Sequence, residues 1–194
     1  MMNEQLTELI FVLDRSGSMA GLEKDTIGGF NSLVKKQCEL PGKTDVTAVL
    51  FDDEYDVLWE GIEAEKAVLT EKEYYVRGMT ALLDAVGKTI LSVSQRLANT
   101  AEDERPKKVL FVITTDGYEN ASREFTYNKV KEMIKHQQEQ NQWEFLFIGA
   151  NIDAAKEAGH IGVSEKDAIQ FEASTAGVQK MYASVHENLA IRRK

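Results

Sequence analysis

Residues 9–18 of the chain read LIFVLDRSGS, and this stretch decides the fold. Its first half, residues 9–13, is a continuous apolar run, which is typical of a strand covered by helices on both faces. Its second half places Asp14, Ser16 and Ser18 directly after that run, and a helical stripe of apolar residues follows. A buried strand, a short polar turn and a helix together predict the first unit of an α/β sheet.

The same alternation of strand and helix continues along the chain. Apolar runs predict four further strands, and stripes with helical spacing predict helices in between; the strands are expected at 46–51, 55–62, 109–113 and 143–148. The tight turn Asp52-Asp53-Glu54 joins the second and third runs, which indicates an antiparallel hairpin at a sheet edge. We therefore expect an α/β fold with a doubly wound, mostly parallel, Rossmann-like sheet, one antiparallel edge strand, and residues 1–194 forming a single domain.

Composition excludes several classes of protein. The 194 residues are 43% apolar and 28% charged, as in ordinary globular domains. A net charge of −9 leaves no broad basic surface, so neither nucleic acid nor an anionic membrane is the expected partner. Without an apolar run of membrane-spanning length or a basic segment ahead of an apolar one, the expected location is cytoplasmic. The single cysteine, Cys38, excludes an internal disulfide framework and is expected at the boundary of the core.

Short oxygen side chains gather on three loops at the expected carboxyl ends of the strands. The first loop holds Asp14, Ser16 and Ser18, the loop before the second helical stripe holds Thr80, and the loop after the 109–113 strand holds Asp116. Ligands of doubly wound sheets bind beyond these strand ends, where the strand order reverses. Two carboxylates and three hydroxyls suit a hard divalent cation, Mg²⁺ or Mn²⁺, better than zinc or copper. An extended turn would aim the first three side chains to one side and turn the intervening residues away.

Each of these residues alone has a simpler explanation. Ser18 or Thr80 alone is more often a helix N-cap, and Asp116 before a glycine is more often part of a turn. Capping needs only one short polar residue per helix, so it does not account for a triplet and two aspartates on neighbouring loops. Glu119 and Asn120 are further candidates to line a metal mouth, although capping of a helix start explains Asn120 equally well.

The pattern as a whole resembles a known family. Asp14-x-Ser16-x-Ser18, then Thr80 in a Gly-x-Thr-x-Leu segment, then Asp116 in Thr-Thr-Asp-Gly resembles the von Willebrand factor A domain over nearly the whole chain. The five positions look like its metal-ion-dependent adhesion site, and the chain looks like the small free-standing bacterial type. The resemblance implies that the three hydroxyls contact the metal directly or through water and that the two carboxylates often do so through water.

That resemblance also implies a function. A metal held in this way accepts a carboxylate from a partner protein, which makes the chain a binding module rather than an enzyme. Adaptor or regulatory subunits of AAA-type ATPases or other intracellular complexes belong to the family, so such a partner is expected. One departure is Arg77, which stands where many relatives carry glycine and bears on the shape of the local loop.

Two other classes of function stay open. A haloacid-dehalogenase-type Mg²⁺ phosphatase also uses an aspartate after its first strand, but its general acid would stand at the position of Ser16. A phosphoacceptor cluster would have to include Asp52 and Asp53, which are better explained as solvated turn residues. In the third class the metal only stiffens the loops of a structural or regulatory subunit.

Overall fold

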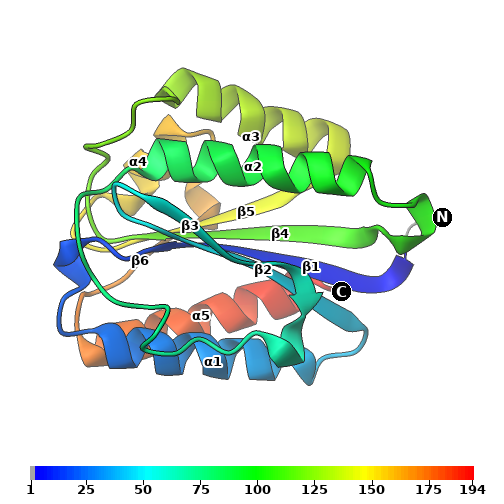
Figure 1. The fold of residues 1–194 in the computed structure, drawn as a ribbon, viewed down its shortest axis with the longest axis horizontal. Helices are drawn as coiled ribbons and strands as arrows, with labels where there is room; N and C mark the ends of the chain where they lie inside the picture. Colours follow the sequence, from blue (N-terminus) through cyan, green and yellow to red (C-terminus); the bar gives the residue numbers. More distant parts are fainter. Residues whose placement is uncertain (1–2) are drawn as a thin grey trace.

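A six-stranded sheet between two layers of helices forms the fold (Figure 1). The computed structural model describes residues 3–194, with side chains from residue 5 onward. The strands, in the spatial order β3-β2-β1-β4-β5-β6, are β1 (Asn3–Asp14), β2 (Lys43–Phe51), β3 (Tyr55–Glu63), β4 (Pro106–Thr115), β5 (Glu144–Gly149) and β6 (Ala168–Gln170). The α-helices are α1 (Glu23–Cys38), α2 (Leu82–Ala98), α3 (Tyr127–Asn141), α4 (Ala154–His160) and α5 (Thr175–Arg192). Four short 3₁₀ turns complete the described elements: η1 (Gly17–Met19), η2 (Ala64–Lys66), η3 (Glu102–Glu104) and η4 (Glu165–Asp167).

The predicted fold class is confirmed. All neighbouring strands run parallel except β2 and β3, which form the expected antiparallel hairpin at one edge. The sequence patterns did not indicate β6 or α4. These elements have three and seven residues, which is too short for a period to show.

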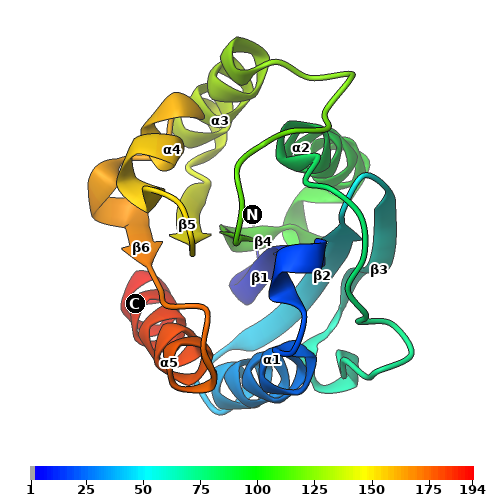
Figure 2. The same cartoon turned by 90° about the vertical axis from the view of Figure 1, so that its left-hand side faces the viewer.

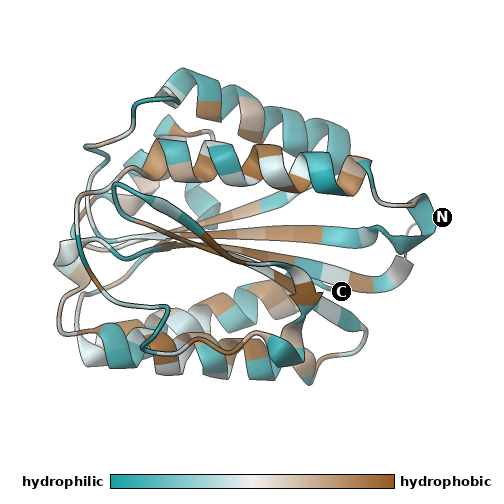
Figure 3. Cartoon of the chain, in the orientation of Figure 1, coloured by the Kyte–Doolittle hydropathy of each residue, from teal (hydrophilic) through white to brown (hydrophobic). Residues whose placement is uncertain are grey.

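The central strand β1 explains why its apolar run is continuous. Leu9, Phe11 and Leu13 pack in the core beneath α1 and α5, whereas Ile10 and Val12 pack in the core beneath α2 and α3. Side chains of a strand alternate between the two faces, so a strand covered on both sides needs apolar residues at every position. Figure 3 shows the same arrangement, with hydrophobic strands in the middle and hydrophilic residues on the outer faces of the helices.

The strand order reverses beside β1. From β1 the chain proceeds to β2 on one side and later returns to β4 on the other, so the loops after β1 and β4 diverge at their carboxyl ends. Figure 2 views the molecule from this end, where the loop after β4 passes beside η1. Such a switch point is where ligands bind in doubly wound sheets. None of the helices in the described residues combines the length and apolarity that a membrane span requires.

Candidate metal centre

Asp14 ties the first loop to the loop after β4. It is the last residue of β1, and its side chain is almost fully buried. Its Oδ1 accepts a hydrogen bond from the Ser16 N–H (2.6 Å), and its Oδ2 accepts one from the Thr115 hydroxyl (2.8 Å) and a longer one from the Asp116 N–H (3.3 Å). Donors from both loops therefore fix the carboxylate at the switch point.

Asp116 carries the least satisfied charge of the site. The residue is 1% exposed, its Oδ1 accepts a hydrogen bond from the Ser16 hydroxyl (3.1 Å), and its buried Oδ2 has no hydrogen-bond partner among the described residues. Burial, together with the charge of Asp14, raises the pKa of Asp116 to about 7. A buried oxygen without a donor beside a second carboxylate is an unfavourable arrangement that a bound cation would relieve.

The hydroxyls of the predicted set converge from two loops, Ser16 and Ser18 from the loop after β1 and Thr80 from the segment before α2. The Ser16 and Ser18 Oγ atoms are 3.5 Å apart. A side-chain carbon placed on Gly117 would lie 3.6 Å from Thr80 Oγ1 and 3.8 Å from Ser18 Oγ, so the absent side chain leaves room between these two hydroxyls. The structure thus brings all five predicted residues to one place.

The helix-cap explanation does not hold for Ser18 or Thr80. The residue before α1 is Leu22 and the residue before α2 is Ala81, and neither makes a side-chain cap. Ser18 instead lies inside η1, and its side chain is exposed at the mouth of the site. Both residues are therefore free of the structural role that most often accounts for such side chains.

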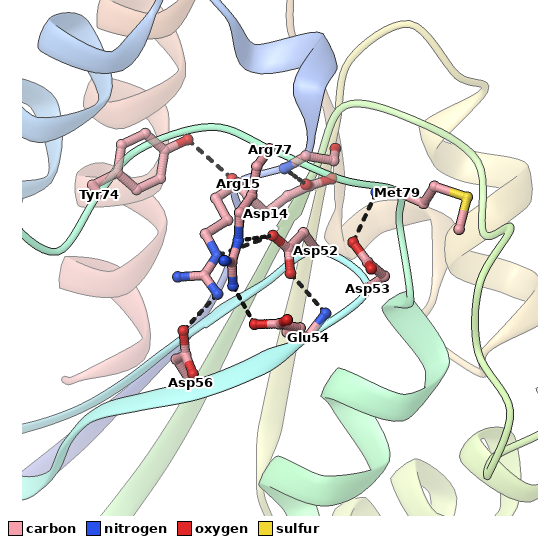
Figure 4. A network of polar contacts seen from close by, with 10 residues as sticks. Asp14, Arg15, Asp52, Asp53, Glu54, Asp56, Tyr74, Arg77 and Met79 are labelled. Carbon is pink, nitrogen blue, oxygen red and sulfur yellow. Dashed lines mark hydrogen bonds and ion pairs between the residues drawn. The ribbon is translucent and has the colours of Figure 1, made fainter.

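The expected extended turn is only partly present. Ser16 has an extended backbone (φ −63°, ψ 162°), but η1 begins at the next residue, so Asp14, Ser16 and Ser18 do not lie along one extended segment. The tight 3₁₀ turn brings Ser18 back beside Ser16, which achieves the same grouping by a different route. Arg15 is turned away as predicted, and its side chain lies buried toward the β2–β3 hairpin (Figure 4).

Glu119 and Asn120 support the site from outside it. The Asn120 side chain accepts a hydrogen bond from the Thr80 N–H (2.8 Å), and the Asn120 N–H donates to the Thr80 carbonyl (3.0 Å). Glu119 accepts hydrogen bonds from the N–H groups of Leu83 (2.9 Å) and Ser122 (2.6 Å). Asn120 thus accepts a backbone N–H just before α2 and Glu119 accepts one in its first turn, whereas the suggestion that they line the metal mouth stays a prediction.

Asp52 lies beside the predicted ligand loops and differs from its expected environment. It was expected to be a solvated turn residue, but it is 0% exposed. Its Oδ2 accepts a hydrogen bond from Arg77 Nε (2.7 Å) and lies 3.5 Å from Arg15 Nε. Arg77, which departs from the family pattern, thus has a specific partner in Asp52. The only sign of this contact in the sequence was the acidic turn itself, because both arginines are distant from it along the chain.

The donor set fits a hard cation. In the part of the chain that the structure describes, no three His, Cys, Asp or Glu side chains lie together as a metal-holding group. A metal at this place would depend on hydroxyl oxygens in addition to Asp14 and Asp116, and such all-oxygen sets are suited to Mg²⁺ or Mn²⁺. Asp116 Oδ2 has no hydrogen-bond partner among the described residues, and such a cation would neutralise its negative charge.

Comparison with protein families identifies the class of this fold and site. The model of the von Willebrand factor type A domain matches residues 8–183. The chain belongs to this family. No curated protein matches the sequence.

Solved structures support the fold. Proximal thread matrix protein 1 from the mussel byssus, in a form with a zinc-occupied MIDAS motif, is 18% identical at a TM-score of 0.64; the match covers 95% of this chain and 46% of that one. Manganese-loaded TRAP protein of Plasmodium vivax is 17% identical at a TM-score of 0.64, covering 93% of this chain and 74% of that one. The pilus adhesin SpaC of Lactobacillus rhamnosus GG is 12% identical at a TM-score of 0.69, covering 96% and 30%. The chain thus spans about half of the mussel protein, and these likenesses concern the fold.

Proposed function

We propose that this protein is a metal-dependent protein-interaction module. Asp14, Ser16, Ser18, Thr80 and Asp116 would hold one Mg²⁺ or Mn²⁺, which when bound supplies an electrophilic position for a carboxylate of a partner protein. The observation that carries this proposal is the buried Asp116 Oδ2, which has no donor among the described residues, while the other oxygen of the same carboxylate accepts the Ser16 hydroxyl. Two of the similar structures, those of the mussel and Plasmodium proteins, are described with zinc or manganese.

The hydrogen bonds of the two carboxylates favour this role. Asp14 already accepts bonds from two N–H groups and one hydroxyl, which spread its negative charge over protein donors. A cation whose nearest ligands are neutral hydroxyls stays poorly neutralised and keeps its attraction for an external carboxylate. Ser18 is exposed, so a partner can approach the metal position from that side.

We further propose that the protein acts as an adaptor or regulatory subunit and not as an enzyme. A phosphatase of the related kind needs a carboxylic acid two residues after its nucleophile, and here the Ser16 hydroxyl occupies that position and donates to Asp116. A cytoplasmic bacterial setting and a partner such as an AAA-type ATPase agree with the family resemblance. Turnover of p-nitrophenyl phosphate with Mg²⁺, lost in Asp14→Asn, would instead establish the phosphatase.

A capture experiment tests the binding function. Purified wild-type protein is immobilised and exposed to cell extract with Mg²⁺ or with a chelator, beside Asp14→Ala and the control Asp103→Ala. Asp103 lies on η3, which precedes β4 at the opposite end of the sheet. We expect one set of proteins to be retained by the wild type and the control with Mg²⁺ only. Equal retention in chelator, or by Asp14→Ala, contradicts a metal-bridged partner.

A further inference from the structure

Asp52 is a buried carboxylate that the metal site itself does not use. It lies in the turn between β2 and β3, and its Oδ1 accepts a hydrogen bond from the Glu54 N–H (2.7 Å). Its Oδ2 accepts the Arg77 Nε–H (2.7 Å) and faces Arg15 Nε at 3.5 Å. A carboxylate without access to water is stable only when cations and donors surround it, so both arginines are needed there.

The two arginines come from the two loops that carry the predicted hydroxyl ligands. Arg15 stands between Asp14 and Ser16, and Arg77 stands three residues before Thr80. Arg15 is 1% exposed and also pairs with Asp56 (2.5 Å), whereas Arg77 is partly exposed and also pairs with Glu54. Both guanidinium groups converge on the hairpin turn, as Figure 4 shows. We call Arg15, Asp52 and Arg77 the Asp52 clamp.

Backbone hydrogen bonds join the same two loops and the hairpin turn. The Arg77 N–H donates to the Arg15 carbonyl (2.9 Å), and the Gly17 N–H donates to the Gly78 carbonyl (3.3 Å), so the two loops are joined directly. The Ala81 N–H, immediately after Thr80, donates to the Asp52 carbonyl (2.8 Å). The segment before α2 has no helix or strand between residues 67 and 81, so tertiary contacts such as these fix its course. The hydrogen bond of the Tyr74 hydroxyl to the Asp14 carbonyl and the Asn120 contact with Thr80 add to them.

Gly78 shows how closely the hairpin turn approaches this segment. It has a φ of +68°, and a side-chain carbon there would lie 2.0 Å from Asp53 Oδ1. The same Asp53 oxygen accepts a hydrogen bond from the Met79 N–H (3.2 Å). The loop that carries Thr80 is therefore held against the acidic turn on both sides of residue 78.

We propose that the Asp52 clamp positions the metal-binding loops, so that Asp52 and Arg77 set the affinity for the cation without contacting it. The proposal rests on the proposed metal-binding function and adds positioning residues to it. Loss of either partner leaves the other charge buried or half-buried with an incomplete set of partners. The Thr80 segment then shifts relative to Ser16 and Ser18. Residues that orient ligands from behind typically change metal affinity by roughly 10- to 100-fold.

Mn²⁺ titration of four variants tests the clamp. Arg77→Gln removes the charge and the Nε–H from a partly exposed side chain, Asp52→Asn removes the central charge, and Arg77→Lys keeps the charge. The matched control, Lys66→Gln, breaks an exposed pair with Glu63 at the beginning of the same connecting region. We expect a dissociation constant for Mn²⁺ about 10-fold or more above that of the wild type in Arg77→Gln and Asp52→Asn. A smaller rise is expected in Arg77→Lys and none in the control.

Two further readouts separate positioning from general stability. The electron paramagnetic resonance spectrum of bound Mn²⁺ should change in Arg77→Gln, because the arrangement of ligands changes, and thermal unfolding in chelator reports the stability of the metal-free fold. An unchanged Mn²⁺ affinity and spectrum in both charge-removing variants overturns the clamp while leaving the proposed function intact. A wild type that binds no Mn²⁺ overturns both.

Discussion

Replacement of Asp116 by asparagine should stabilise the metal-free protein while removing its ability to bind a cation. Burial and the neighbouring Asp14 raise the pKa of Asp116 to about 7, so ionisation of this side chain opposes folding increasingly from about pH 4 and most strongly above pH 7. Asparagine keeps an oxygen that can accept the Ser16 hydroxyl. Its amide also supplies donors that can face Asp14 where a second carboxylate now stands. The site is thus expected to hold an arrangement that costs stability for the sake of binding.

The magnitude follows from the shift in the Asp116 pKa. A rise from the ordinary value of about 3.9 to about 7 corresponds to roughly 4 kcal/mol at pH 8, at about 1.4 kcal/mol per unit. Solvent at the mouth screens the charges, and the asparagine amide must itself be buried and hydrogen-bonded. These two effects reduce the expected gain in unfolding free energy to about 2 kcal/mol. For a chain of this length that is a rise in melting temperature of roughly 4–8 °C.

The pH dependence of the stability difference between Asp116→Asn and the wild type is an internal control. A carboxyl whose pKa is raised by folding contributes its full stability below the unfolded value, near pH 4, and loses it as the pH rises through about 7. The advantage of Asp116→Asn over the wild type should therefore be small near pH 4 and largest at pH 8.

Urea unfolding in chelator, followed by the fluorescence of Trp59 and Trp143, measures these differences. Added Mg²⁺ should then stabilise the wild type by mass action and leave Asp116→Asn unchanged. A variant that is no more stable than the wild type at pH 8, or an advantage that is the same at pH 4 and pH 8, would refute the reasoning.

The remaining predictions concern the scaffold of the site. A side-chain carbon on Gly29 would meet the Tyr182 ring at 2.3 Å, whereas Gly28 has open space; Gly29→Ala should thus lose about 1–3 kcal/mol of unfolding free energy and Gly28→Ala should gain up to about 1 kcal/mol. Opposite effects on chemical denaturation confirm the α1–α5 contact, and equal effects contradict it. Although burial opposes it, three backbone N–H groups of residues 123–125 lower the pKa of Asp84 overall, so its contribution to stability should be present above about pH 4 and be lost as the pH falls further. Asp84→Asn should cost about 2 kcal/mol at pH 7 and progressively less as the pH falls below about 4, and a loss independent of pH would exclude this role.

The strands were predictable because their signal is local. Every residue from Leu9 to Leu13 is apolar since β1 is covered on both faces, and the same holds for residues 109–113 of β4. The elements β6 and α4 were not predicted, because segments of three and seven residues are too short to show a clear period of apolar residues. The hairpin was predicted from its tight turn, but the burial of Asp52 within that turn was not.

For the candidate site too, one part was predictable from the sequence and another was not. Asp14, Ser16 and Ser18 are close in sequence, and strand topology then brings Thr80 and Asp116 to them, so their grouping was predictable. The clamp was not, because Arg15, Asp52 and Arg77 meet only through tertiary packing. Likewise, the Asn120 contact with the backbone of Thr80 joins two loops that no local pattern relates.

The central claim concerns one cation held by oxygen atoms at the end of β1 and β4. The most direct measurement is the anomalous diffraction of Mn²⁺ in crystals of the wild-type protein, collected beside crystals of Asp14→Ala. The account predicts a single strong peak in bonding contact with the hydroxyls of Ser16 and Ser18 and none in the variant. A saturating Mn²⁺ soak that leaves this position without a peak, or places the ion elsewhere, would contradict it.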